Sequence, residues 1–154
     1  MALLNSTARI KDLAVGASAT DHTALMRVVA PTNQKLRVKF KAWSKGTTAG
    51  DTPIRFTVRR GVSTSGGTTA SITLAKMNGQ DAETLQATAY SYSVTPTNKS
   101  ETNNGTVVDQ FTITPLGGRG ESLPIQVNGG ETLDLWGITA TNAGSVDIEA
   151  EIQE

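Results

Sequence analysis

The feature that most constrains the fold of this chain is a stretch in which apolar and basic side chains alternate. Residues 34–45 place an apolar side chain at every second position and a basic side chain at most positions between. Because successive side chains of a strand point to opposite faces, whereas a helix repeats about every 3.6 residues, this pattern predicts a β-strand with one buried face. The apolar residues are Leu36, Val38, Phe40 and Ala42, and the basic residues are Lys35, Arg37, Lys39 and Lys41.

The same period of two recurs along the chain and predicts an all-β protein. Two further segments, 54–60 and 146–153, alternate as clearly. The less regular candidates are 24–29, 70–76, 84–92, 107–114, 122–127 and 132–138. Asn-Gly pairs along the chain suit the tight turns of antiparallel strands, because these residues tolerate positive φ. About eight strands joined in this way predict an antiparallel two-sheet sandwich of jelly-roll type.

Length and composition bound the class of protein. A chain of 154 residues has the size of one domain and can bury roughly 70% of its unfolded surface without metals or disulfides. It contains no cysteine, which excludes disulfide frameworks, thiolate metal sites and cysteine nucleophiles. Its 14 Lys and Arg residues balance 14 Asp and Glu residues, and no apolar run approaches the ~20 residues that cross a bilayer. We therefore predict a soluble domain with no nucleic-acid or membrane partner.

At the beginning of the chain, the apolar residues follow neither the strand period of two nor the helix period of about 3.6 for more than a few residues. They fall at irregular intervals between polar ones, and this segment is too polar to serve as a signal peptide. We therefore predict an N-terminal arm over residues 1–20, followed by the sandwich domain over residues 21–154. The arm residues that we expect to contact a partner are Leu3, Leu4, Ile10 and Leu13.

The last predicted strand carries an acidic row at alternate positions. Asp147, Glu149 and Glu151 would all lie on one strand face, with too many like charges for the single acid and base pair of a glycosidase. We interpret this row as a solvated face. In a jelly roll the last strand pairs with an early one, so we predict that the acidic row lies beside the basic row of Lys35, Arg37, Lys39 and Lys41. Each exposed pair would contribute only ~0.2–1 kcal/mol, so the pairing would set register more than stability.

No other pattern predicts catalysis or a cofactor. His22 is the only histidine, and it lies in a polar stretch without a nucleophile motif around any serine. No calcium-loop pattern is present, so we predict no metal and no cofactor. The basic row, extended by Arg55, Arg59 and Arg60, is a candidate for nucleic-acid binding, but the neutral net charge and the scarcity of stacking aromatics disfavour it.

Two tryptophans keep a carbohydrate-binding surface open as an alternative. Trp43 and Trp136 fall in the polar-facing phase of their predicted strands, where an exposed ring could stack on a sugar. The competing interpretation places them at strand ends or in a subunit interface, where tryptophan is also enriched.

The order of segments resembles that of a family of viral proteins. The strand Leu36–Trp43 is followed by a strand over Pro53–Gly61 and a Ser/Thr/Gly-rich loop over Val62–Thr69. The closing unit, Leu123–Trp136, joins two short strands through a Gly-Gly-Glu turn, and an alternating strand ends at Glu149–Glu154. Over the whole chain, this layout resembles the jelly-roll decoration (cement) proteins of tailed-bacteriophage capsids.

The resemblance implies a structural protein with no enzymatic activity. Such a protein is made in the host cytoplasm and joins the virion as a homotrimer on the outer capsid surface, where it binds the major capsid protein and stabilises the head. Related jelly rolls occur in tail fibres, so the alternative is a receptor-binding or carbohydrate-binding module of a fibre.

Overall fold

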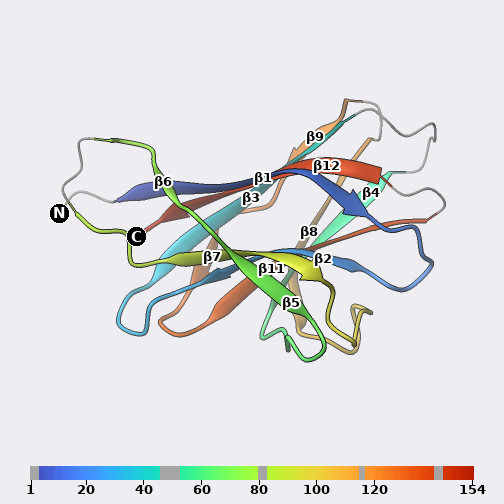
Figure 1. The fold of residues 1–154 in the computed structure, drawn as a ribbon, viewed down its shortest axis with the longest axis horizontal. Helices are drawn as coiled ribbons and strands as arrows, with labels where there is room; N and C mark the ends of the chain where they lie inside the picture. The colour runs from blue at the N-terminus through green and yellow to red at the C-terminus, as the bar shows by residue number, and fades with distance from the viewer. Residues whose placement is uncertain (1–3, 46–52, 80–82, 115–116, 141–143) are drawn as a thin grey trace.

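The computed structural model describes residues 4–45, 53–79, 83–114, 117–140 and 144–154. Two antiparallel six-stranded sheets pack face to face (Figure 1), which confirms the predicted all-β sandwich. Sheet A consists of β1 (Asn5–Val15), β3 (Leu36–Ser44), β6 (Ala75–Lys76), β9 (Arg119–Glu121), β10 (Ile125–Val127) and β12 (Gly144–Gln153). Sheet B consists of β2 (Thr23–Val29), β4 (Ile54–Arg60), β5 (Thr68–Ile72), β7 (Thr88–Val94), β8 (Thr106–Ile113) and β11 (Thr132–Thr139). The residues so described include no helix that could span a membrane.

The strands pair in an order far from their order along the chain. In sheet A the order is β10-β3-β12-β1-β6, with β9 also paired to β3, and in sheet B it is β5-β7-β2-β11-β4-β8. Since β12 occupies one edge of β3 along most of its length, β9 and β10 lie one after the other on the opposite edge. Each sheet therefore joins segments from both ends of the sequence.

The core lies between the sheets and follows the alternation of the sequence. The apolar positions of β3, for example Val38 and Phe40, are fully buried, as are Ile148 and Ala150 of β12. From sheet B, large side chains that fill the same core are Met26, Phe56, Val58, Leu133 and Leu135. Because inward and outward side chains alternate, the charged residues between the apolar positions of β3 and β12 face away from this core.

Residues Asn5–Val15, which fall within the expected arm, form β1, an internal strand of sheet A between β12 and β6. The alternation is hard to read because small Ser6 and Ala8 occupy inward positions, and because the register shifts between Ile10 and Leu13. At this bulge Asp12 has a φ of 57°, and its backbone N donates to Asp147 Oδ1 at 2.9 Å. An extra residue inserted into one strand reverses the faces of all residues beyond it, so neither period persists.

The apolar residues of the expected arm therefore serve the sandwich. Leu4 is only 5% exposed, and its backbone pairs with that of Glu154 through Glu154 N to Leu4 O at 2.9 Å. Ile10 and Leu13 are half-buried and pack against the core. Leu3 lies outside the described residues. Over Asn5–Val15 the prediction of a separate arm is thus corrected, and Leu4 is not available to contact a partner.

Candidate functional site

The two outer faces of the sandwich differ, and each is a candidate site. We call the outward side of β1, β12 and β3 the open face. We call the outward side of sheet B beneath the loop 95–105 the covered face, because groups of this loop bond to side chains of β4. Arg59 Nη1, for example, donates to Ser100 O at 3.0 Å and to Asn104 O at 3.3 Å.

On the open face, the structure brings the acidic row of β12 beside the basic row of β3. Glu149 lies opposite Lys41, and Glu151 lies opposite Lys39. The ion pairs are shifted from this register: Lys41 Nζ contacts Glu151, while Lys39 Nζ reaches Glu121 Oε1 on β9 at 2.9 Å. Long lysine side chains allow such diagonal contacts between neighbouring strands.

The other two acidic residues of β12 contact basic side chains, one from β1 and one from the end of β3. Glu149 contacts Arg9 of β1, whose guanidinium carbon also lies 5.9 Å from the centre of the Trp43 ring. Asp147 lies opposite Trp43, and its Oδ2 is 3.5 Å from Lys45 Nζ. Trp43 is therefore half-buried beside Arg9 rather than free as a flat platform.

Two basic residues of the row have no acidic partner within the described part of the chain. Lys35 precedes the first residue of β3, and Arg37 lies opposite Gln153. Both are exposed, and neither forms an ion pair with any residue that the structure describes. Of the basic row, Lys41 thus forms an ion pair with the acidic row of β12, whereas Lys39 pairs with Glu121 of β9, and the end of β3 near Lys35 stays positively charged.

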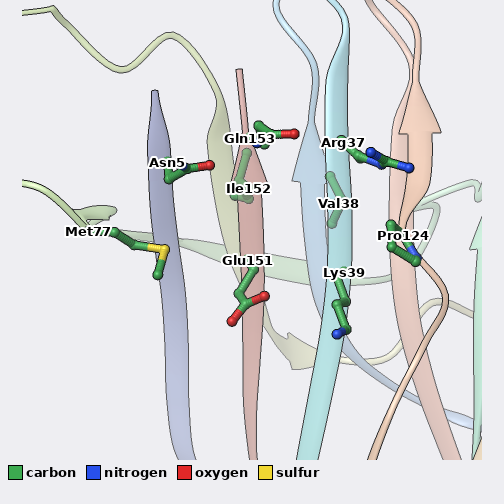
Figure 2. A pocket seen from close by; sticks show the side chains of 9 residues that line it. All are labelled: Asn5, Arg37, Val38, Lys39, Met77, Pro124, Glu151, Ile152 and Gln153. Atoms are coloured by element: carbon green, nitrogen blue, oxygen red, sulfur yellow. The ribbon is translucent and has the colours of Figure 1, made fainter. Parts of the chain in front are cut away.

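A groove lies at this end of the open face (Figure 2). It has a volume of about 410 Å³ and crosses β1, β12 and β3. Its side chains are Asn5, Arg37, Lys39, Met77, Pro124, Glu151 and Gln153, with Val38 and Ile152 at the floor. The groove therefore combines charged groups with apolar walls.

The covered face holds a guanidinium that is fully removed from solvent. Arg59 is 0% exposed, and its guanidinium carbon lies 4.4 Å from the centre of the Trp136 ring. Besides the two loop carbonyls, it donates from Nε to Thr57 Oγ1 at 3.1 Å. Burial lowers the pKa of Arg59 to about 10, so the group stays positively charged at neutral pH. Stacking on an aromatic ring and hydrogen bonds to carbonyls replace the water that a buried cation loses.

A buried carboxylate, that of Asp134, belongs to the residue directly opposite Arg59 on the neighbouring strand. Asp134 on β11 accepts from Arg27 Nε at 3.0 Å and from the hydroxyl of Tyr92. Arg27 also donates from Nη2 to Val62 O at 2.6 Å. Burial raises the pKa of Asp134 to about 6 and raises the pKa of Tyr92 further above its ordinary range. These bonds tie β2, β7 and β11 together on the outer side of sheet B.

His22 lies at the edge of this network. It is buried, its Nε2 is 3.4 Å from Glu101 Oε1, and Glu101 also binds Arg55. Burial, assisted by the nearby charge of Arg59, lowers the pKa of His22 to about 4. The hydrogen bond from Arg55 lowers the pKa of Glu101. The imidazole is therefore neutral and fixes the loop to the start of β2.

Asn104 joins two loops over this face. Its Oδ1 accepts from Ser63 N at 2.8 Å, and its Nδ2 donates to Ser63 O and Asn98 O, each at 3.0 Å. Gly105 follows with a φ of +75°, and a Cβ there would approach Arg60 O to 2.9 Å. The Asn104-Gly105 pair therefore forms a turn and also links two loops, because the side-chain amide of Asn104 connects residue 63 to the loop 95–105.

The sequence patterns did not identify the covered face as a site. Trp136 faces outward, as its phase indicates, but it is 0% exposed and so offers no platform for a sugar. Of the three arginines that extended the basic row as a candidate for nucleic acid, Arg59 is buried, Arg55 binds Glu101 and Arg60 Nη1 lies 2.6 Å from Glu131 Oε2. The sequence contains one signal that could have indicated this face: Arg59 and Trp136 lie in the outward phase of their strands, and the chain also has a long polar loop, 95–105, that could cover them.

Comparison with protein-family models and with curated proteins finds no match for this chain. Within the described part of the chain, no cluster of three or more His, Asp or Glu side chains is arranged to hold a metal ion.

Proposed function

We propose that this chain is a jelly-roll structural protein of a virion, a decoration (cement) protein that binds the outer surface of a phage head and stabilises it. The observation that carries the proposal is the nesting of the strand pairs. β1 pairs with β12, β2 with β11, β3 with β9 and β10, and β4 with β8. A long antiparallel hairpin of eight elements that is rolled into two sheets has this order, which supports assignment to the jelly roll. The family that the sequence layout resembles is built on this architecture.

The distribution of charge supports binding through the open face. The covered face is closed by the protein's own loop, whereas the open face is solvated, carries paired charges and contains a groove. A charge-patterned surface gives a docking protein its register and rate of association. We propose the major capsid protein as the partner that binds there.

An uncharged sheet edge supports the proposal of a homotrimer. β5 lies at the edge of sheet B and consists of Thr, Ala, Ser and Ile residues, most of them exposed. Free strand edges without charged residues are prone to pair with other chains. A symmetric oligomer would cover such an edge.

The alternative, a receptor-binding or carbohydrate-binding fibre module, has less support. The sugar platform would have to come from Trp43 or Trp136, yet Trp136 is buried and Trp43 lies beside Arg9. We also propose that the protein is not an enzyme. The candidate base, His22, is buried and hydrogen-bonded to a carboxylate that is itself bound to Arg55.

The test is binding of the purified protein to expanded heads that lack it. We expect saturable cosedimentation, a trimer mass in native mass spectrometry, and greater resistance of decorated heads to heat. A strictly monomeric protein that does not bind heads would contradict the proposal. Glycan-dependent binding that is lost in Trp43→Ala would instead favour the fibre module.

A further inference from the structure

The groove of Figure 2 continues into a second hollow and forms one trough at the end of the open face. The second hollow holds about 420 Å³ and shares Arg37, Pro124 and Gln153 with the groove. It extends the trough past Lys35 and Gln126. The trough therefore runs across sheet A from Met77, beside β1, to the segment that precedes β10. We call this combined hollow the trough.

The charges of the trough are unbalanced in favour of cations. Lys39 and Glu151 also line it, but each is engaged by a partner on sheet A, Glu121 and Lys41 respectively. Glu154 accepts from the backbone N atoms of residues 86 and 87, the nearer contacts being 2.9 and 3.0 Å. Arg37 and Lys35 have no acidic partner among the described residues.

The arginine of the trough is positioned to meet an incoming carboxylate. In Figure 2 the Arg37 side chain extends from β3 toward Pro124, beside the hollow and not across it. A guanidinium can bind a carboxylate through two parallel hydrogen bonds, which a lysine cannot do. An exposed arginine in a concave site is thus a specific hydrogen-bond donor for an acidic side chain.

The trough also has two apolar side chains on its walls, Met77 and Pro124. Met77 is 62% exposed, and Leu123, which precedes Pro124 in the sequence and lies outside the lining, is 69% exposed. Methionine adapts to irregular surfaces, so it is common at binding sites. Exposed apolar side chains next to unpaired cations are typical of a surface that a partner covers.

We propose that the trough is the docking site for an extended acidic segment of the protein's partner. One carboxylate of this segment binds Arg37 and a second lies near Lys35, while apolar side chains of the segment contact Pro124 beside Arg37 and Met77 at the β1 end of the trough. This inference rests on the proposed function, since it assigns the part of the open face that meets the capsid.

The first test measures binding to heads of charge-reversed variants. Arg37→Glu is expected to weaken binding about tenfold or more, because it replaces an attraction with a repulsion. Arg119→Glu is the matched control: Arg119 is also exposed on sheet A, but it lies on β9, opposite Trp43 at the other end of β3. Its binding is expected to stay within about twofold of the original protein. Equal binding by Arg37→Glu and the original protein would overturn the trough as docking site while leaving the proposed function intact.

The second test needs no heads and therefore separates the inference from the proposed function. A synthetic ten-residue peptide that alternates Glu with Val is titrated into the isotope-labelled protein, and backbone amide shifts are followed by NMR. We expect shifts confined to the ends of β3, β10 and β12 around the trough, which disappear in Arg37→Glu and at high salt. A peptide with Lys in place of Glu should produce none. Equal shifts with both peptides, or a drop in native mass of Arg37→Glu, would overturn the inference, the latter because a second copy of the chain would then occupy the trough.

Discussion

The outer faces of the two sheets carry similar kinds of charged residue in opposite environments. On the open face, the paired side chains of Lys41 and Glu151 are 20% and 31% exposed, so water reaches both. On the covered face, the side chains of Arg59 and Asp134 are inaccessible to water. The difference arises because the loop 95–105 closes over one sheet and nothing comparable among the described residues closes over the other.

This difference determines what each set of charges can do. An exposed ion pair contributes little to stability, because water and salt compete for both partners. A buried charge that loses its partners costs several kcal/mol, because no solvent replaces them. We therefore expect the covered face to determine stability and the open face to determine binding.

The largest expected effect is that of Arg59→Ala. The variant loses the contact with Trp136 and leaves Ser100 O, Asn104 O and Thr57 Oγ1 without their donor. We expect the free energy of unfolding to fall by about 3–5 kcal/mol, measured by urea denaturation. Arg119→Ala, at an exposed position of β9, is the control and should change it by less than about 0.5 kcal/mol. A small effect of Arg59→Ala would mean that the loop is not fixed through this guanidinium.

The next effect is a dependence on pH that arises from His22. Burial lowers the pKa of His22 from 6.5 to about 4, so the unfolded chain binds the proton more tightly than the folded protein. Stability from this group is therefore complete above about pH 7 and is lost as the pH falls from 6.5 to 4, by up to about 3 kcal/mol. Asp134, whose pKa is raised to about 6, acts in the opposite direction over pH 4–6 and would mask part of the loss.

The difference between the original protein and His22→Gln isolates the histidine, because Asp134 is present in both. A glutamine amide can still donate to Glu101, so the variant should fold. The stability of the original protein relative to His22→Gln should fall as the pH decreases from 7 to 4. A difference that does not change with pH would contradict a buried, neutral His22.

The contrast between the faces also explains what could be predicted from the sequence. The charged rows of the open face could be predicted from local alternation, because β3 and β12 each have a strict period of two and their outward residues are charged. The covered face could not, since it depends on where a loop with no periodicity lies in three dimensions. Nothing near Arg59 in the sequence indicates that Ser100 O and Asn104 O will surround it.

The beginning of the chain shows a second limit. β1 was not recognised as a strand because Ser6 and Ala8 face the core and because the bulge at Asp12 interrupts the alternation. Such a strand is specified by its neighbour β12, whose Ile148 and Ala150 lie opposite Ile10 and Ala8. The pairing of the two ends of the chain is a tertiary property, so it was not visible in residues 1–20 alone.

A smaller effect is expected for Asn104→Ala, which tests the link between the two loops of the covered face. The variant removes three hydrogen bonds to the backbone at residues 63 and 98, and Asn104 is only 5% exposed. We expect a loss of about 1–3 kcal/mol, with faster amide exchange in the loop 95–105. Asn98→Ala is the control, because its side chain is exposed and only its backbone accepts from Asn104. Equal effects of the two variants would show that the Asn104 amide does not fix the loops.

The smallest expected effect is that of Lys41→Gln on the open face. Lys41 contacts Glu151, but both side chains are partly exposed, so we expect a loss of no more than about 1 kcal/mol at low ionic strength. In about 1 M NaCl, where the screening length falls to about 3 Å, the loss should be close to zero. Asp134→Asn provides the comparison, because the contacts of Asp134 with Arg27 and Tyr92 are shielded from salt and its cost should persist. If Lys41→Gln cost as much as Asp134→Asn, or if salt did not reduce its cost, the open face would contribute to stability as the covered face does. The distinction drawn between the faces would then be wrong.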